Sequence, residues 1–103
     1  MIYQYVGHYL YNQLSVSNNA PDSMGVYYCG VLNQENKLII YYIGRAMGDG
    51  VTIKSRLFDH LRNDNWSDVT YFGHQVCTTK QEAEDFEKEE IAKYKPKYNE
   101  QGV

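Results

Sequence analysis

Six side chains in this sequence have the types that handle a phosphate group: two phenols, two guanidinium groups, one imidazole and one carboxylate. They are Tyr27, Tyr42, Arg45, Arg56, His60 and Glu87. Arginine binds phosphate oxygens, a carboxylate can hold a divalent cation, and a phenol or an imidazole can orient or deprotonate water. The sequence shows neither a serine or cysteine nucleophile placed with a suitable base nor a Cys/His zinc cluster. The set therefore suits hydrolysis of a phosphodiester with one divalent cation.

The two tyrosines belong to a predicted β-hairpin. Apolar and aromatic residues at 24–32 and 37–44 predict two strands, and the polar segment 33–36 predicts the turn between them. If this turn is symmetric, the numbers of paired residues sum to 69. Tyr27 then lies directly opposite Tyr42 on the same face of the sheet, at the open end of the hairpin. A slip of one residue would move one tyrosine to the opposite face.

The same register assigns structural roles to two neighbours of Tyr42. Tyr41 would lie opposite Tyr28 on the opposite face, where it would serve in packing. Gly44 would keep the backbone slim, so that a phosphate could approach the end of the strand.

Arg56 and His60 belong to a predicted amphipathic helix over 52–62. Its apolar stripe consists of Ile53, Leu57 and Leu61. Arg56 and His60 are four residues apart, so they lie one above the other on the border of this stripe. A border position lets a side chain reach a cleft without entering the core. The alternative is an ordinary surface arginine and histidine on an amphipathic helix.

Glu87 belongs to a predicted last helix over 79–94, which begins at the capping box of Thr79 and Glu82. Its inner face combines Ala83, Phe86, Glu87, Glu90, Ile91 and Tyr94. Because an unpaired buried carboxylate is costly, we expect Glu87 to be bound to a metal or paired, the latter with Arg56 or Arg62. Periodicity alone does not exclude Glu90 as the functional carboxylate. Pro96 ends the helix and predicts an extended tail.

With a third strand over 69–78, the order of elements predicts an α+β fold: a small, mainly antiparallel sheet of three core strands flanked by helices. Residues 24–103 would form this domain. Residues 1–23 would be an N-terminal extension that ends in a loop over 17–23. The alternating tyrosines over 1–17 predict an added strand or a bent pair of strands, with a dimer face or base stacking as alternatives.

Composition limits the classes of function. The 103 residues suffice for one domain. The net charge of −3 argues weakly against a protein that binds nucleic acid. Residues 37–62, however, hold five basic and two acidic residues, whereas 80–92 hold two basic and six acidic ones. The sequence has neither a long apolar run nor a signal-peptide pattern, so we expect a cytoplasmic protein without a membrane partner. We expect Cys29 and Cys77 to be buried free thiols.

The candidate residues named above also occur in the order found in a known nuclease family. "GVY" at 25–27 and "YIG" at 42–44 resemble the two motifs that name the GIY-YIG nucleases, and a basic residue, Arg45, follows the second. "SRLFDH" supplies Arg56 and His60, and "EAEDFEKEEIAKYKPKYN" resembles the closing block of the family. Counting back from Ile91 in that block selects Glu87, and the tail supplies Asn99. The resemblance covers about residues 24–100, with a somewhat longer loop between YIG and Arg56.

The resemblance implies a GIY-YIG-type DNA endonuclease that uses a single Mg²⁺ or Mn²⁺, with Glu87 as its protein ligand. Arg56 would stabilise the phosphate charge. The attacking water would be handled by Tyr27, Tyr42 and His60, and the sequence does not decide which tyrosine contacts it. The residues assigned to substrate binding are Arg45, Lys54 and Asn99, the last of which would fix the tail against the site. A homodimer or a partner protein would supply target choice.

Two other readings compete with a DNA endonuclease. The first is a catalytically weak or inactive module of the same fold that binds DNA or protein, which the sequence pI of about 5.5 favours. A glutamate inside an apolar stripe argues against it, because a scaffold does not need one. The second is an RNA-directed or general phosphodiesterase.

Overall fold

A computed structural model describes residues 1–101 and confirms the α+β class. The elements in chain order are β1 (Val6–Leu10), α1 (Gln13–Asn19), β2 (Gly25–Leu32), β3 (Leu38–Ala46), α2 (Ile53–Arg62), β4 (Tyr71–Val76), α3 (Lys80–Tyr94) and α4 (Lys97–Gln101). The strands form one antiparallel sheet in the order β1-β4-β2-β3. Both β1 and β3 are therefore edge strands. Within residues 1–101, no helix is long and apolar enough to cross a membrane.

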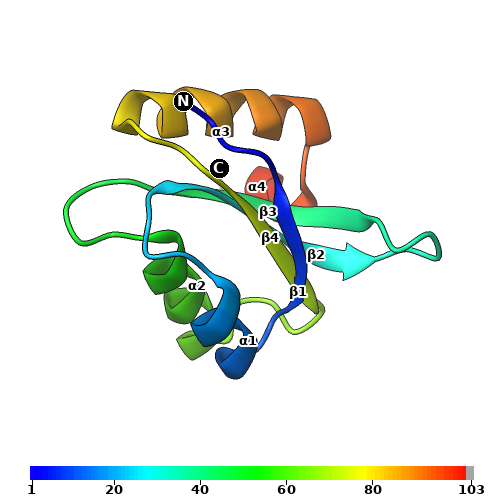
Figure 1. Ribbon diagram of the computed structural model, residues 1–103. Helices are drawn as coiled ribbons and strands as arrows, with labels where there is room; N and C mark the ends of the chain where they lie inside the picture. Colours follow the sequence, from blue (N-terminus) through cyan, green and yellow to red (C-terminus); the bar gives the residue numbers. More distant parts are fainter. Residues whose placement is uncertain (102–103) are drawn as a thin grey trace.

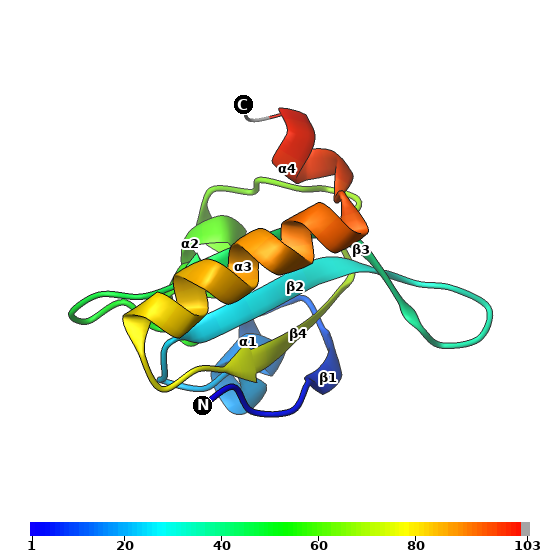
Figure 2. The ribbon, with the colours of Figure 1, turned by 90° about the horizontal axis from the view of Figure 1, so that it is seen from above.

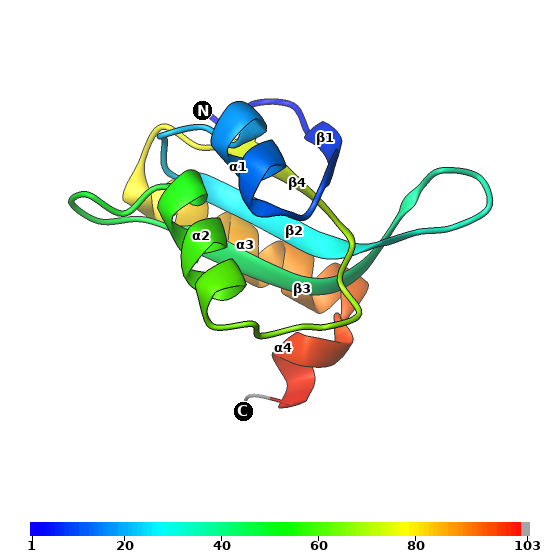
Figure 3. The ribbon, with the colours of Figure 1, turned by 90° about the horizontal axis from the view of Figure 1, so that it is seen from below.

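Helices cover both faces of the sheet (Figure 1). Helix α3 lies over β2 and β3 on one face (Figure 2). Helices α1 and α2 lie side by side on the opposite face (Figure 3). Alternate residues of β2 serve the two layers: Tyr27 and Cys29 pack in the core that includes α1 and α2, whereas Val26 and Tyr28 pack in the core that includes α3. This alternation decides which tyrosines can share a site.

The N-terminal segment forms an added strand, as its alternating tyrosines predict, but the strand covers only Val6–Leu10, and the prediction is wrong from Gln13, where α1 begins. Strand β1 pairs with β4 in antiparallel fashion. The loop predicted over 17–23 is wrong in part, because α1 continues to Asn19. The side chain of Asn12 caps α1, and Val16 is fully buried in the shared core. Residues of the extension therefore pack into the same core as the rest of the chain.

The β2–β3 hairpin forms, but the predicted register is wrong. The turn includes Lys37, so that Leu32 pairs with Leu38, and Asn33 Oδ1 accepts hydrogen bonds from the backbone nitrogens of Glu35 and Lys37. A bulge then shifts the register by one more residue between Cys29 and Gly30.

After these two shifts Tyr27 pairs with Gly44, and Tyr42 pairs with Cys29. Because the shifts add to two residues, Tyr27 and Tyr42 remain on one face as diagonal neighbours. Tyr41 does not face Tyr28 as expected; it packs at the core that contains Tyr27 and Tyr42, with its ring centroid 6.1 Å from that of Tyr98.

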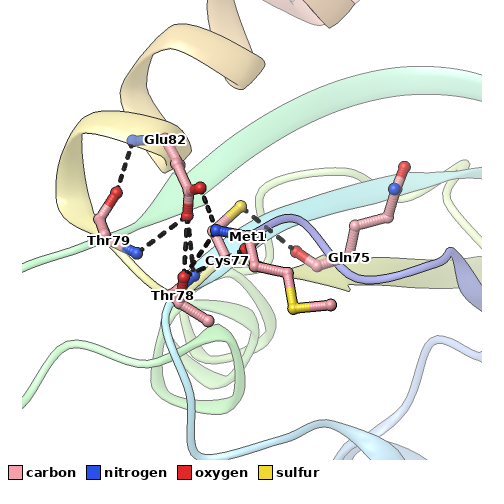
Figure 4. Close-up of polar contacts among 6 residues, drawn as sticks. All are labelled: Met1, Gln75, Cys77, Thr78, Thr79 and Glu82. Carbon is pink, nitrogen blue, oxygen red and sulfur yellow. Dashed lines mark hydrogen bonds and ion pairs between the residues drawn. The ribbon is translucent and has the colours of Figure 1, made fainter.

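Helix α3 begins at the predicted capping box of Thr79 and Glu82. Figure 4 shows that the Glu82 carboxylate also accepts from the Thr78 side chain, at 3.0 Å, and from the Met1 nitrogen, which ties the first residue to the start of this helix. The extended tail predicted after Pro96 is wrong. Lys95 ends α3 in the left-handed conformation, Pro96 is buried, and α4 begins at Lys97. The free thiols Cys29 and Cys77 are both buried, as expected.

Candidate active site

Three rings predicted to handle water lie together between the sheet and α2. The ring centroids of Tyr27 and Tyr42 are 6.2 Å apart, and His60 lies 5.7 Å from Tyr27 and 5.4 Å from Tyr42. The phenols come from β2 and β3, and His60 comes from the last turn of α2. Tyr27 is fully buried, whereas Tyr42 is partly exposed. Of the two phenols, Tyr42 is therefore the more accessible to a substrate or a water molecule.

Gly44 makes room for one of these phenols. A Cβ atom at position 44 would lie 2.4 Å from both Cζ and Oη of Tyr27. The slim backbone at Gly44 is therefore used by the ring of Tyr27 that lies across it, and a phosphate does not need to approach there. This corrects the role expected for Gly44.

His60 forms hydrogen bonds through both ring nitrogens. Nε2 lies 2.9 Å from Oη of Tyr27, and Nδ1 lies 2.8 Å from Nδ2 of Asn65. With the Asn65 amide donating to Nδ1, the ring proton resides on Nε2 and is donated to Tyr27. In this arrangement Tyr27 retains its own hydroxyl proton for donation to another group. The hydrogen bond from His60 thus fixes the position of the Tyr27 hydroxyl.

The surroundings keep this cluster neutral near pH 7. Burial raises the pKa of Tyr27, and the adjacent Tyr42 adds to this effect while Arg56 opposes it. Burial also raises the pKa of Tyr42, with a further contribution from the Glu87 charge. Burial lowers the pKa of His60 to about 4, and the charge of Arg56 acts in the same direction. Both phenols are therefore protonated, and the imidazole is uncharged.

The low pKa of His60 predicts a loss of stability in acid. In the unfolded chain His60 binds its proton near its ordinary pKa of 6.5, whereas in the folded protein it does so near 4. The unfolded state therefore binds more protons within this window, and the free energy of unfolding should fall as pH drops from about 6.5 to about 4. One pKa unit is worth about 1.4 kcal/mol, so the expected loss is about 3 kcal/mol.

Urea unfolding followed through the fluorescence of Trp66, the single tryptophan, would measure this loss. The comparison is with His60→Gln, which should have a flatter stability curve between pH 6.5 and 4. Burial also lowers the pKa of His74, but His74 is present in both proteins, so the difference between their curves isolates His60. If the free energy of unfolding falls equally with pH in both proteins, the low pKa is not that of His60.

Arg56 lies on α2 one turn before His60 and adjoins both phenols. Its positive charge opposes the rise in the pKa of Tyr27 and of Tyr42. Among residues 1–99, whose side chains the structure describes, it makes no ion pair, which leaves its guanidinium available to an anion. Arg62, on the same helix, is bound instead to Asp59.

Glu87 lies on α3, in the layer opposite the three rings, and it pairs with a residue of edge strand β3. Oε1 of Glu87 lies 2.5 Å from Nη1 of Arg45, and the Glu87 side chain is 12% exposed. Its partner is thus Arg45, neither of the two arginines expected. Its negative charge raises the pKa of Tyr42.

Glu90, the competing carboxylate, faces a different part of the sheet. Its Oε1 accepts a hydrogen bond of 2.7 Å from Oη of Tyr28, on the face that α3 covers. The two glutamates therefore have different partners, because Glu87 binds Arg45 and Glu90 binds Tyr28.

Of the residues assigned to substrate binding, Lys54 pairs with another side chain, whereas Asn99 fixes the C-terminal tail, the role expected for it. The Lys54 ammonium lies 3.8 Å from the Asp22 carboxylate. Asn99 binds the backbone of edge strand β3, where its Oδ1 accepts from the Ile43 nitrogen and its Nδ2 donates to the Ile43 oxygen, both at 2.8 Å. This pairing holds α4 against β3.

Sequence reasoning missed two members of the cluster, Asn65 and Trp66. The Trp66 ring lies 4.4 Å from that of His60 and 4.7 Å from that of Tyr42, and Tyr98 stacks on it at 6.1 Å. Both residues come from a polar loop, which hides them from any search based on periodicity. The one available signal was a lone tryptophan six residues after the histidine.

The residues present fit a hydrated divalent cation held by one carboxylate. Among the side chains of residues 1–99, no group of three or more His, Cys, Asp or Glu could form a metal cage. Arg45 binds Oε1 of Glu87, and Oε2 has no hydrogen bond to the part of the chain that the structure describes. Mg²⁺ commonly keeps several water ligands and uses one or two carboxylates, so this single oxygen is a suitable ligand.

The cluster lies apart from a groove of about 600 Å³ on the opposite flank of α2, which is lined in part by Tyr11, Phe58 and Arg62. None of the residues predicted for catalysis lines that groove. No family model, curated protein or solved structure matches the chain.

Proposed function

We propose that the protein is a metal-dependent endonuclease of the GIY-YIG type that hydrolyses phosphodiester bonds in DNA. The observation that carries the proposal is the hydrogen bond of 2.9 Å between Tyr27 and His60, directly beside Tyr42 and Arg56. Two phenols, an imidazole and a guanidinium without an ion pair thus lie together on one face of the sheet. These groups can bind a phosphate and position a water molecule.

In this proposal Tyr42 contacts the attacking water, because it is the partly exposed phenol. Tyr27 and His60 act as positioning residues, since Tyr27 is fully buried and His60 is 7% exposed. Arg56 binds the phosphate and stabilises the charge that develops on it. At neutral pH the raised pKa of Tyr42 makes it a hydrogen-bond donor in the free protein.

Glu87 would hold Mg²⁺ or Mn²⁺ through its free oxygen, with Arg45 retaining the other oxygen in place. The bound ion would supply Lewis-acid stabilisation of the leaving oxygen. Arg45 is 36% exposed and can also reach a phosphate at the rim of the site.

Arg56→Ala provides a test, with Arg62→Ala as a matched control on the same helix. Arg62 is 70% exposed and pairs with Asp59, so its loss should leave activity almost unchanged. Loss of Arg56 removes a charge that stabilises the transition state, so plasmid nicking with Mg²⁺ should slow by about 10²- to 10³-fold. A chelator should abolish nicking by the wild-type protein.

Three results would count against the proposal: equal nicking by both arginine variants, nicking that survives the chelator, or no nicking by the wild type. A substrate panel of duplex DNA, branched DNA, single-stranded RNA and a small phosphodiester identifies the substrate class. Preference for RNA or for the small ester would replace the DNA assignment.

One observation favours a second candidate, a non-catalytic module of the same fold that binds DNA or protein. The Glu87 carboxylate already has a partner in Arg45, so its position in an apolar stripe is satisfied without a metal. This candidate predicts DNA or protein binding that is independent of Mg²⁺ and of Glu87.

A further inference from the structure

A second group of aromatic and acidic side chains surrounds a cavity on the α3 face of the sheet. The cavity measures about 230 Å³ and lies between the N-terminal segment, the sheet and α3. Three tyrosines line it, together with Glu90: Tyr5 precedes β1, Tyr28 lies in β2 and Tyr94 ends α3. Tyr28 and Glu90 pack with the core that α3 covers, whereas Tyr27 and Tyr42 pack in the opposite layer. The cavity is thus separate from the proposed active site.

The position of Tyr5 depends on two glycines. A Cβ atom at Gly73 would lie 1.9 Å from Oη of Tyr5, and one at Gly7 would lie 2.7 Å from it. The absence of side chains at both positions lets the phenol lie on the sheet, with its ring edge-to-face with Tyr28 at 5.6 Å. The Tyr5 hydroxyl is held by Nδ1 of His8 at 2.7 Å. The backbone thus shapes the floor of the cavity around this ring.

Glu90 supplies the charge of the cavity. Its Oε1 accepts from Oη of Tyr28 at 2.7 Å, which fixes the carboxylate at the floor. Its Oε2 makes no hydrogen bond to the part of the chain that the structure describes. Leu38 and Ile40 add apolar surface, and neither Lys nor Arg is among the residues found to line the cavity. A negative charge among apolar and aromatic walls favours a cation over an anion.

We propose that this cavity binds a small organic cation whose charge is spread over methyl groups, a quaternary ammonium. Tyrosine faces attract such cations through their quadrupoles, and a carboxylate adds direct attraction. The Tyr94 ring already has a cation near it, the Lys93 ammonium at 5.1 Å from its centroid. The methyl groups would contact Leu38 and Ile40, where a hydrated metal ion or a bare ammonium would lose water without compensation. This inference is independent of the proposed nuclease function.

Titration with choline, compared with its uncharged isostere 3,3-dimethylbutan-1-ol, tests the proposal. Amide chemical shifts measured by NMR would report both binding and its location. Choline should give saturable binding in the millimolar range or tighter, with shifts centred on Tyr5, Tyr28 and Glu90. The neutral isostere should bind at least about tenfold more weakly, since it lacks the charge that the rings and the carboxylate attract.

Variants distinguish binding in the cavity from nonspecific binding. Glu90→Gln and Tyr94→Leu should each weaken choline binding by about tenfold, and Tyr3→Ala, at an exposed position that does not line the cavity, should not. Tyr94 is 46% exposed, so its replacement should leave the fold intact. A peptide with trimethyllysine, compared with the unmodified peptide, distinguishes a protein-borne cation from a free one. Equal binding of the isostere, unchanged binding in both cavity variants or no saturable binding would overturn the proposal.

Discussion

Replacement of Glu87 by glutamine is expected to slow plasmid nicking by about 10³-fold. The amide keeps the size of the side chain and can still accept a hydrogen bond from Arg45. It loses the negative charge that a divalent cation requires. The rate with saturating Mg²⁺, measured beside that of the wild type, gives the effect directly.

Glu90→Gln is the matched control for this experiment. Glu90 lies on the same helix, but its Oε1 binds Tyr28 on the face that α3 covers. Its replacement should leave the nicking rate within a few-fold of the wild type. If both variants nick at the same rate, Glu87 does not have the role assigned to it.

Replacement of Gly44 by alanine is expected to have the largest effect on stability. The new Cβ would lie 2.4 Å from Cζ and Oη of Tyr27, a ring that is fully buried and cannot turn away. Overpacking of this kind commonly costs about 1 to 3 kcal/mol, and we expect a value near the top of that range. For a domain of this size, thermal unfolding should then begin roughly 10 to 20 °C lower.

A double-mutant cycle with Tyr27→Leu tests the cause of this loss. If the clash with the ring is responsible, Gly44→Ala should cost much less when leucine replaces the tyrosine, since the ring is gone. Additive losses in the double variant would show that Gly44 is required for another reason, such as backbone conformation.

The hairpin shows how far sequence reasoning reaches. Strand positions and the shared face of Tyr27 and Tyr42 follow from alternation, which depends on parity alone. The register does not, because Asn33 draws Lys37 into the turn and a bulge adds a residue to β3. Each of these errors shifts the pairing by one residue, and together they restore the parity. The prediction for the two tyrosines was therefore right about the face and wrong about the pairing.

Two short helices could not be read from periodicity. Helix α1 contains Ser and Asn, which are weak helix formers, and it forms around a buried valine, Val16. Helix α4 follows Pro96 directly and lies against β3, where Asn99 binds the edge strand. In both helices tertiary contacts decide the structure, and such contacts are invisible to a local pattern. The capping box of α3, by contrast, is a local interaction and was predicted correctly.

In the candidate site, too, positions set by local spacing were predicted, and positions set by tertiary contacts were not. Arg56 and His60 were placed by helical spacing, and both adjoin the phenols. The partner of Glu87 could not be found this way, because Arg45 and Glu87 belong to two elements that are far apart in the sequence, β3 and α3. Trp66 lies in a loop whose path depends on the packed rings themselves.

Binding of Mn²⁺ in the absence of DNA would show whether Glu87 holds a divalent cation. Electron paramagnetic resonance of the free ion during titration counts the ions bound by the wild type, Glu87→Gln and Glu90→Gln. A single site is expected in the wild type and in Glu90→Gln, with its loss in Glu87→Gln. Retention of the site in Glu87→Gln, or no bound ion in the wild type, would contradict this role of Glu87.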